Sequence, residues 1–176
     1  MTVSGDYAAD LLVVGAGACG LAAAIAAHDA GISVAIAEKR DRPGGNSSLS
    51  TGSIPGAGSK YQSAAGIQDS ADQMVADLLA VSGHHDADAL TILMAQQSAP
   101  LCEWLIDDLG ARMELITAYK HVGHTVERLH APRSRRGQDL VEIHLPLPSA
   151  KTFNTIASRR VKAIIPSSPK PAATSC

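Results

Sequence analysis

The segment that most restricts the fold of this chain is residues 15–20, a GxGxxG sequence between an apolar run and an alanine-rich stretch. Residues 9–14 predict a fully buried strand, residues 20–30 a helix that ends at Gly31, and residues 32–37 a second strand. A strand, a helix and a strand within about thirty residues match one right-handed βαβ unit. The sequence therefore predicts an α/β fold with a Rossmann-like βαβ start.

Each glycine of this motif has its own role in a turn that binds a diphosphate. Gly15 permits the tight turn, Gly17 lets the backbone approach a pyrophosphate, and Gly20 lets the helix pack close to the strand. The free N–H groups and the positive dipole end of the helix then stabilise the diphosphate. Ala18 and Cys19, which lie inside the motif, are therefore candidate cofactor-binding residues as well.

Glu38 indicates which nucleotide the turn binds. It lies at the end of the second strand, 18 residues after Gly20. A carboxylate at this position can accept hydrogen bonds from both adenosine-ribose hydroxyls and repels a 2′-phosphate, which disfavours NADP. A glycine-rich turn that binds nothing is the alternative, but the motif, its flanking elements and the acidic residue together favour a nucleotide.

A second glycine pair lies in the loop of residues 41–59, which is rich in Gly, Ser, Pro and Asn. Such a pair lets another backbone segment close over the diphosphate and flavin of FAD, which a simple NAD-binding Rossmann unit does not need. Residues 51–53 would then run beneath the flavin ring, where N–H and hydroxyl donors tune its electronics. A flexible surface loop is the alternative for residues 44–53. The candidate cofactor-binding residues here are Gly44, Gly45, Asn46, Ser47, Ser48, Thr51 and Gly52.

The chain resembles the N-terminus of the flavoprotein family that contains fumarate reductases, succinate dehydrogenase flavoprotein subunits and ketosteroid dehydrogenases, over the stretch LLVVGAGACGLAAAIAAHDAGISVAIAEKRDRPGGNSSLSTGSI. In that family the acidic strand end is followed by a basic residue, here Lys39, and then by a glycine doublet. Members that attach flavin covalently use a histidine in this loop. Residues 41–59 contain none, so the resemblance implies noncovalent FAD.

The resemblance also implies an activity. Enzymes of this family are FAD-dependent oxidoreductases that transfer hydride between flavin and a C–C bond next to a carboxylate or carbonyl. An unsaturated acid or a ketosteroid is therefore the expected small-molecule substrate. By resemblance, the arginine and histidines that act on substrate lie far beyond residue 145 in much longer chains, so no catalytic residue is assigned here and activity of this chain is left open.

The composition changes near residue 143. All 17 acidic residues precede that point, whereas the last 34 residues contain five basic residues and no acidic one. We expect residues 1–144 to form the N-terminal part of an FAD-binding domain, with an added helical region at 68–110. Residues 145–176 read as a disordered tail. The pattern favours an incomplete domain, so a truncated, catalytically inactive FAD-binding fragment is one alternative. A small NAD-binding regulatory module is another.

The helical region predicts three helices. Ser70 with Gln73 forms a capping box before the first, the apolar spacing of residues 90–97 indicates the second, and Ser98 with Pro100 starts the third. A half-buried strand then follows, because Met113 and Leu115 alternate with polar residues.

Two groups of polar residues farther along are weaker candidates. The first group either lines a cavity over the flavin or lies solvated on a loop or edge strand. Two of its histidines, His121 and His124, have no evident third ligand, so no metal site is predicted. The second contacts phosphate or lies on a solvated loop, where arginine is usually found. The first group is His121, His124, Arg128 and His130, and the second is Arg133, Arg135 and Arg136.

The composition disfavours several other classes of protein. A net charge of −2 and an aromatic content of 3% give no reason to expect a nucleic-acid partner. The three cysteines form no CxxC pair, which indicates a reduced, cytoplasmic protein. The N-terminal residues lack a basic region and a long apolar run, so neither a signal peptide nor a membrane span is predicted. The sequence does not indicate an oligomeric state.

Overall fold

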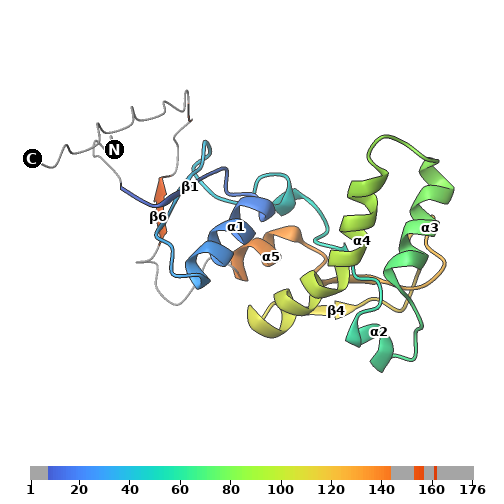
Figure 1. Ribbon diagram of the computed structural model, residues 1–176. Helices are drawn as coiled ribbons and strands as arrows, with labels where there is room; N and C mark the ends of the chain where they lie inside the picture. Colours follow the sequence, from blue (N-terminus) through green and yellow to red (C-terminus); the bar gives the residue numbers. More distant parts are fainter. Residues whose placement is uncertain (1–7, 144–152, 157–160, 162–176) are drawn as a thin grey trace, which may run out of the picture.

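The computed structural model describes residues 8–143, 153–156 and 161. They form two lobes joined by a short helix (Figure 1). One lobe contains a parallel sheet, and the other an antiparallel sheet with helices beside it. In chain order the elements are β1 (Leu11–Val14), α1 (Ala18–Asp29), β2 (Val34–Ala37), the 3-10 helix η1 (Ser47–Leu49), β3 (Ile54–Pro55), α2 (Lys60–Ala64), α3 (Ala71–Ser82), α4 (Asp88–Glu103), the π-helix η2 (Trp104–Asp108), β4 (Met113–Leu115), β5 (Leu129–Pro132), α5 (Gly137–Ile143) and β6 (Phe153–Ile156).

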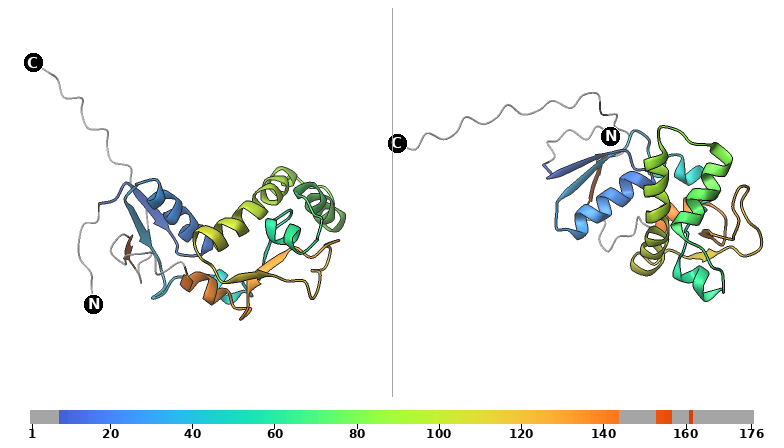
Figure 2. Two further views of the ribbon diagram at one scale, coloured as in Figure 1. Left: turned by 90° about the horizontal axis from the view of Figure 1, so that it is seen from below. Right: turned by 45° about the vertical axis from the view of Figure 1, so that its right-hand side comes forward.

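The first lobe confirms the predicted βαβ start. Its parallel sheet has the strand order β1-β2-β6, and α1 packs against β1 and β2 (Figure 2). All four residues of the central strand β2 are buried. The prediction that the first strand is fully buried is wrong, since Leu12 and Val14 are 50% and 55% exposed. β1 lies at the sheet edge, where fewer neighbouring side chains cover it.

The strand β6 lies within the segment that the composition assigned to a tail. It pairs in parallel with β2, with Val34 opposite Phe153 and Ala37 opposite Ile156. A strand of this kind takes its hydrogen-bond partners from a distant segment, so its own four residues carry little signal. Apart from this strand and Val161, the expected tail lies outside the described residues.

The second lobe contains the antiparallel sheet β3-β5-β4, with α3 and α4 packed side by side. Ala57, Met74 and Ala95 form its helical core. The predicted strand at residues 113–115 is confirmed as β4, and the half of the capping box in which the Ser70 hydroxyl accepts from the backbone of the third helical residue is present.

The prediction of a new helix at Ser98 is wrong, because α4 continues through Pro100. The Ser98 side chain is buried, donates to the Ala95 carbonyl at 2.7 Å and accepts from the Ala57 N–H at 3.0 Å. Ser98 therefore joins α4 to the loop before α2 and does not cap a helix. No helix in the described part of the chain has the length and hydropathy needed to cross a bilayer.

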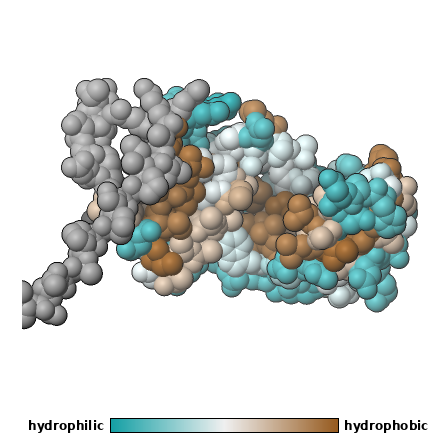
Figure 3. Space-filling model, turned by 45° about the horizontal axis from the view of Figure 1, so that its top comes forward, coloured by the Kyte–Doolittle hydropathy of each residue, from teal (hydrophilic) through white to brown (hydrophobic). Residues whose placement is uncertain are grey.

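One face of α4 carries apolar side chains that the rest of the described protein leaves uncovered. Leu90, Leu93 and Met94 are 67%, 52% and 50% exposed. Figure 3 shows brown surface both beside the grey residues and across the helical side of the molecule. The apolar spacing that predicts this helix thus marks a face directed away from the core of the lobe.

The helix α5 connects the two lobes through consecutive side chains. Val141 packs with Ala16, Leu21 and Ile36 in the first lobe. Leu140 packs in a separate cluster of the second lobe that contains Leu105 and Ala111. Because neighbouring helical residues point in different directions, one turn of α5 contacts both cores.

A buried ion cluster holds β5 against the helices of the second lobe. The Arg128 side chain donates two hydrogen bonds to Asp69, each 2.9 Å long, and one to Asp77 of 2.8 Å. All three side chains are at most 3% exposed. Asp77 also accepts from the backbone N–H and the hydroxyl of Thr125. The prediction that Arg128 is either solvated or lines a flavin cavity is therefore wrong.

We expect Arg128→Met to lower the free energy of unfolding by about 3–5 kcal/mol, because it leaves two buried carboxylates without a cation. Urea denaturation followed by circular dichroism measures this. Arg133 is a matched control, since its ion pair with Glu114 is exposed, and Arg133→Met should cost less than about 1 kcal/mol. Equal losses in the two variants would contradict the structural role of the cluster.

The Asp77 carboxyl predicts a pH dependence of stability. Burial raises its pKa, but hydrogen bonds from Thr125, Gln73 and Arg128 prevail and lower the pKa to about 2. A carboxyl with a lowered folded-state pKa stabilises the protein above its unfolded value, and this contribution is lost as the pH falls. We expect unfolding free energy to fall from pH 3.8 toward pH 2, and Asp77→Asn to lack this part of the decline. Parallel curves of unfolding free energy against pH for the unmodified protein and for Asp77→Asn would contradict this role of Asp77.

Candidate functional site

The first glycine loop has the geometry that a tight strand-to-helix turn requires. Gly15 has a φ of +98°, which favours glycine, and Gly17 is the N-cap of α1. A Cβ added to Gly20 would lie 2.0 Å from the Gly15 carbonyl oxygen and 3.2 Å from the Val13 side chain. The start of α1 therefore packs directly on the end of β1, and only glycine fits at Gly20.

The second glycine loop packs against the first. The Gly44 N–H donates to the Ala16 carbonyl at 2.7 Å, and Gly17 and Gly44 form an isolated parallel bridge. A Cβ added to Gly45 would lie 3.6 Å from the Gly17 Cα. Two segments that lie about thirty residues apart in sequence are thus in backbone contact, as one βαβ crossover allows.

The serines of the second loop extend this contact. The Ser47 hydroxyl accepts a hydrogen bond from the Ala18 N–H at 3.2 Å, so η1 touches the first turn of α1. Ser48 donates to the Gly45 carbonyl at 2.9 Å and stabilises the loop itself. Asn46 is the N-cap of η1 and is exposed.

The space in front of the first loop fits a diphosphate. A Cβ added to Gly15 or Gly17 would meet no heavy atom within 4 Å, so this side of the turn is open. The N–H groups of the first helical turn, including that of the exposed Cys19, have no intrahelical acceptor. An open turn with free N–H donors at a helix N-terminus is the arrangement that binds phosphate.

Glu38 lies beside this turn as a buried carboxylate, 5% exposed. One of its oxygens accepts from the Ala16 N–H at 2.8 Å and the other from the Arg40 N–H at 2.9 Å. These two bonds lower the pKa of Glu38 against the opposing effect of burial. Each carboxylate oxygen has a second lone-pair position, so the ionised group can still accept from ribose hydroxyls. Lys39 is exposed.

The end of the second loop packs on the segment before α5. The Gly137 N–H donates to the Ser50 carbonyl at 2.8 Å, and a Cβ on Gly137 would lie 2.0 Å from the Ser47 carbonyl oxygen. Gly52 has a φ of +69° and also faces Gly137. The Thr51 hydroxyl donates to Ser53 at 3.0 Å. Gly137 was not among the residues predicted for the site, since its packing partners Ser47, Ser50 and Gly52 lie more than eighty residues earlier in the sequence.

The histidines of the weaker candidate group do not lie in this arrangement. His130 is fully buried, with its Nε2 3.0 Å from the Ser59 hydroxyl and its Nδ1 3.1 Å from the Arg128 carbonyl. The His121 and His124 rings are adjacent, with centroids 5.5 Å apart. Within the described residues no group of three His, Cys, Asp or Glu side chains is placed to hold a metal.

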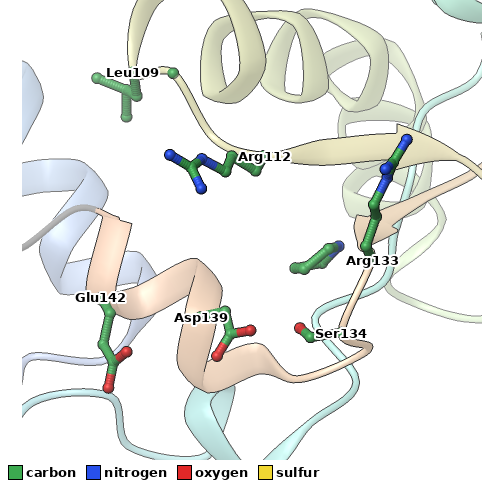
Figure 4. Close-up of a pocket in the computed structure, with 8 residues that line it drawn as sticks. Leu109, Arg112, Arg133, Ser134, Asp139 and Glu142 are labelled. Carbon is green, nitrogen blue, oxygen red and sulfur yellow. The ribbon is translucent and has the colours of Figure 1, made fainter.

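A hollow of about 760 Å³ lies between β4 and α5 (Figure 4). Figure 4 shows Arg112 pointing into the space that Asp139 and Glu142 border from α5. Arg133 also lines it and pairs with Glu114. Its charges of both signs compensate one another, so size alone does not make it the functional site.

Comparison with protein families gives one match over most of the chain. A family model described as an FAD binding domain matches residues 10–164. This range includes both glycine loops, Glu38, the helical lobe and β6.

Comparison with individual proteins gives the same result. A probable fumarate reductase of Shewanella frigidimarina is 30% identical over 158 residues, which are 88% of this chain and 26% of that protein. The open conformation of a flavocytochrome c3 fumarate reductase has a TM-score of 0.76 at 30% identity, over 85% of this chain and 26% of that one.

A 3-ketosteroid-Δ4-(5α)-dehydrogenase from Rhodococcus jostii has a TM-score of 0.65 at 22% identity, over 87% of this chain and 38% of that one. At this identity the likeness concerns the fold. The chain thus spans about a quarter of the length of the fumarate reductases that it matches.

Proposed function

This chain belongs to the FAD-binding domain family, and on that premise we propose that its two glycine loops and Glu38 hold FAD in an oxidoreductase that acts on an unsaturated carboxylic acid. The observation that carries the proposal is the backbone contact of Gly17 with Gly44 beside an open helix N-terminus. A single nucleotide-binding turn does not need this second glycine segment.

Each part of the site has a role in holding the cofactor. The N–H groups of Gly17 and Cys19 suit the diphosphate, because they lie at the N-terminus of α1, whereas the Ala18 N–H is bonded to the Ser47 hydroxyl. The ionised Glu38 suits the adenosine ribose. The loop from Asn46 to Gly52 continues away from this turn toward α5 and suits the ribityl chain and the flavin ring.

The bound flavin supplies hydride transfer to or from a C–C bond next to a carboxylate or carbonyl. The residues of this chain would hold the FAD, and backbone N–H groups would bind its diphosphate. The Gly52 backbone, which packs on Gly137, gives the loop a rigid support where the ring would lie. No residue of the described part is assigned as the proton donor.

The comparisons favour one of the two substrate classes. The fumarate reductases match at 30% identity, whereas the ketosteroid dehydrogenase matches at 22%. The proposed substrate class is therefore an unsaturated acid, with a ketosteroid as the second class. The noncovalent attachment of FAD remains part of the proposal, since residues 41–59 contain no histidine.

We expect Gly17→Val to abolish FAD binding without unfolding the protein. Gly17 has φ −78° and ψ 178°, which any residue adopts, and its added Cβ contacts nothing in the protein. The valine side chain would instead fill the space meant for the diphosphate. Ala26→Val, at an exposed position of the same helix, is the control. Titration with FAD, followed by quenching of flavin fluorescence, measures the affinity.

Glu38→Gln tests the ribose contact in the same titration. It keeps one acceptor for the Ala16 N–H but loses the charge, and we expect about tenfold weaker binding, in line with a lost hydrogen bond to a charged group. Unchanged affinity in both this variant and Gly17→Val would refute the site assignment.

Substrate class is tested with the FAD-loaded chain after anaerobic reduction by dithionite. We expect fumarate or acrylate to restore the oxidised flavin spectrum and 4-androstene-3,17-dione to leave it reduced. Free reduced FAD with the same acids is the control for uncatalysed reaction. Binding of FAD without reoxidation by any of these compounds would contradict the proposed activity for this chain and leave cofactor binding standing.

A further inference from the structure

A second hollow, of about 540 Å³, lies on one side of the loop that contains η1. Ser47 faces α1 and contacts the Ala18 N–H, whereas the four residues that follow Ser47 line this hollow. The loop thus has two different sides. We call the hollow the arginine hollow; its lining residues are Arg42, Ser48, Leu49, Ser50, Thr51, Arg135, Arg136 and Gln138.

The two walls of the arginine hollow are fixed relative to each other. Gly137 lies against the loop, with its N–H bonded to the Ser50 carbonyl at 2.8 Å and its Cα 3.1 Å from the position of a Cβ on Gly52. No side chain larger than hydrogen fits at Gly137. The arginines that precede it are therefore held beside the loop by backbone packing.

The lining contains three cations and no carboxylate. Arg42 makes no hydrogen bond or ion pair with any described residue. The Arg135 guanidinium donates once, to the Tyr119 hydroxyl at 3.3 Å, and the Arg136 guanidinium donates once, to Asp139 at 2.9 Å, with which it forms an ion pair. Each guanidinium carries five N–H donors, so most of them remain available. The hollow in Figure 4, by contrast, has acidic and basic side chains together.

The backbone of Arg135 has an unusual conformation. Its φ of +55° is the only positive value of a non-glycine residue among the described ones. Its N–H donates to the Pro132 carbonyl at 2.9 Å, and its guanidinium lies 5.7 Å from the centre of the Tyr119 ring. A strained residue costs stability and often marks a functional position. Here the turn places Arg135 in the lining of the arginine hollow.

From this geometry we propose that the arginine hollow binds a small oxyanion, a molecule that carries a carboxylate or phosphoryl group. Guanidinium groups bind both kinds of group through paired N–H donors. A volume of about 540 Å³ lies within the range of small-molecule sites. The proposal goes beyond the proposed FAD site. Ser48 and Thr51 of the lining also belong to the loop proposed to hold the flavin, so the test compares the chain with and without FAD.

The test is isothermal titration of the chain with inorganic phosphate and, separately, with succinate, at constant ionic strength and with and without FAD. We expect saturable binding of at least one anion, with similar affinity in both forms. The tighter of the two anions identifies the ligand as phosphoryl or carboxylate.

Three variants remove the arginines one at a time. Arg42→Gln and Arg136→Gln should each weaken anion binding by on the order of tenfold, the size of a lost charge-assisted hydrogen bond. Arg135→Gly should weaken it as well while the melting temperature stays unchanged or rises, because glycine relieves the positive φ. Arg133→Gln removes the same charge outside the arginine hollow and should leave anion affinity unchanged.

Two results would overturn the proposal. One is the absence of saturable binding of either anion, or an equal loss of affinity in all four variants, which would show a general effect of net charge. The other is complete loss of anion binding on loading with FAD, together with weaker FAD binding in the arginine variants. The arginines would then belong to the flavin site.

Discussion

The close approach of glycine backbones at the start of α1 is the constraint on which the rest of the structure depends. Gly20 allows the helix to lie against the Gly15 carbonyl, and Gly17 then faces Gly44. Farther along, Gly137 lies against the Ser47 carbonyl. A side chain at Gly20 would push α1 away from β1, and one at Gly137 would push α5 away from the loop that contains η1. The candidate cofactor site therefore depends on close contacts between backbone segments.

The same contacts explain how a short helix joins two lobes. The position of Gly137 sets the start of α5, and the next turn sends Leu140 and Val141 into different clusters. The loop that carries the candidate flavin residues lies against this helix. Cofactor position and lobe position therefore depend on one set of packing contacts, because the same backbone carries both.

Charge has two separate uses in this protein. In the second lobe Arg128 is neutralised by two buried aspartates, which holds β5 and the helices together. In the proposed cofactor site Glu38 is kept ionised by backbone N–H groups. The arginine hollow differs from both, since its lining has no carboxylate. Burial with full pairing indicates a structural group, whereas the arginine hollow gathers three cations of which Arg136 alone forms an ion pair among the described residues.

The sequence by itself determined the βαβ start, because a glycine spacing and an apolar period are local patterns that reflect nearby geometry. The resemblance of residues 11–54 to a flavoprotein family indicated the FAD-binding fold. The local composition of residues 41–59 also marked Gly44 and Gly45 as a second glycine segment. Only the tertiary structure decided that Phe153–Ile156 pairs with β2 and that Ser98 lies within a continuous helix. It also decided that Arg128 is buried while Arg42 lines a hollow. In each of these cases the partner is far away in the sequence, and burial, pairing and charge compensation depend on that partner.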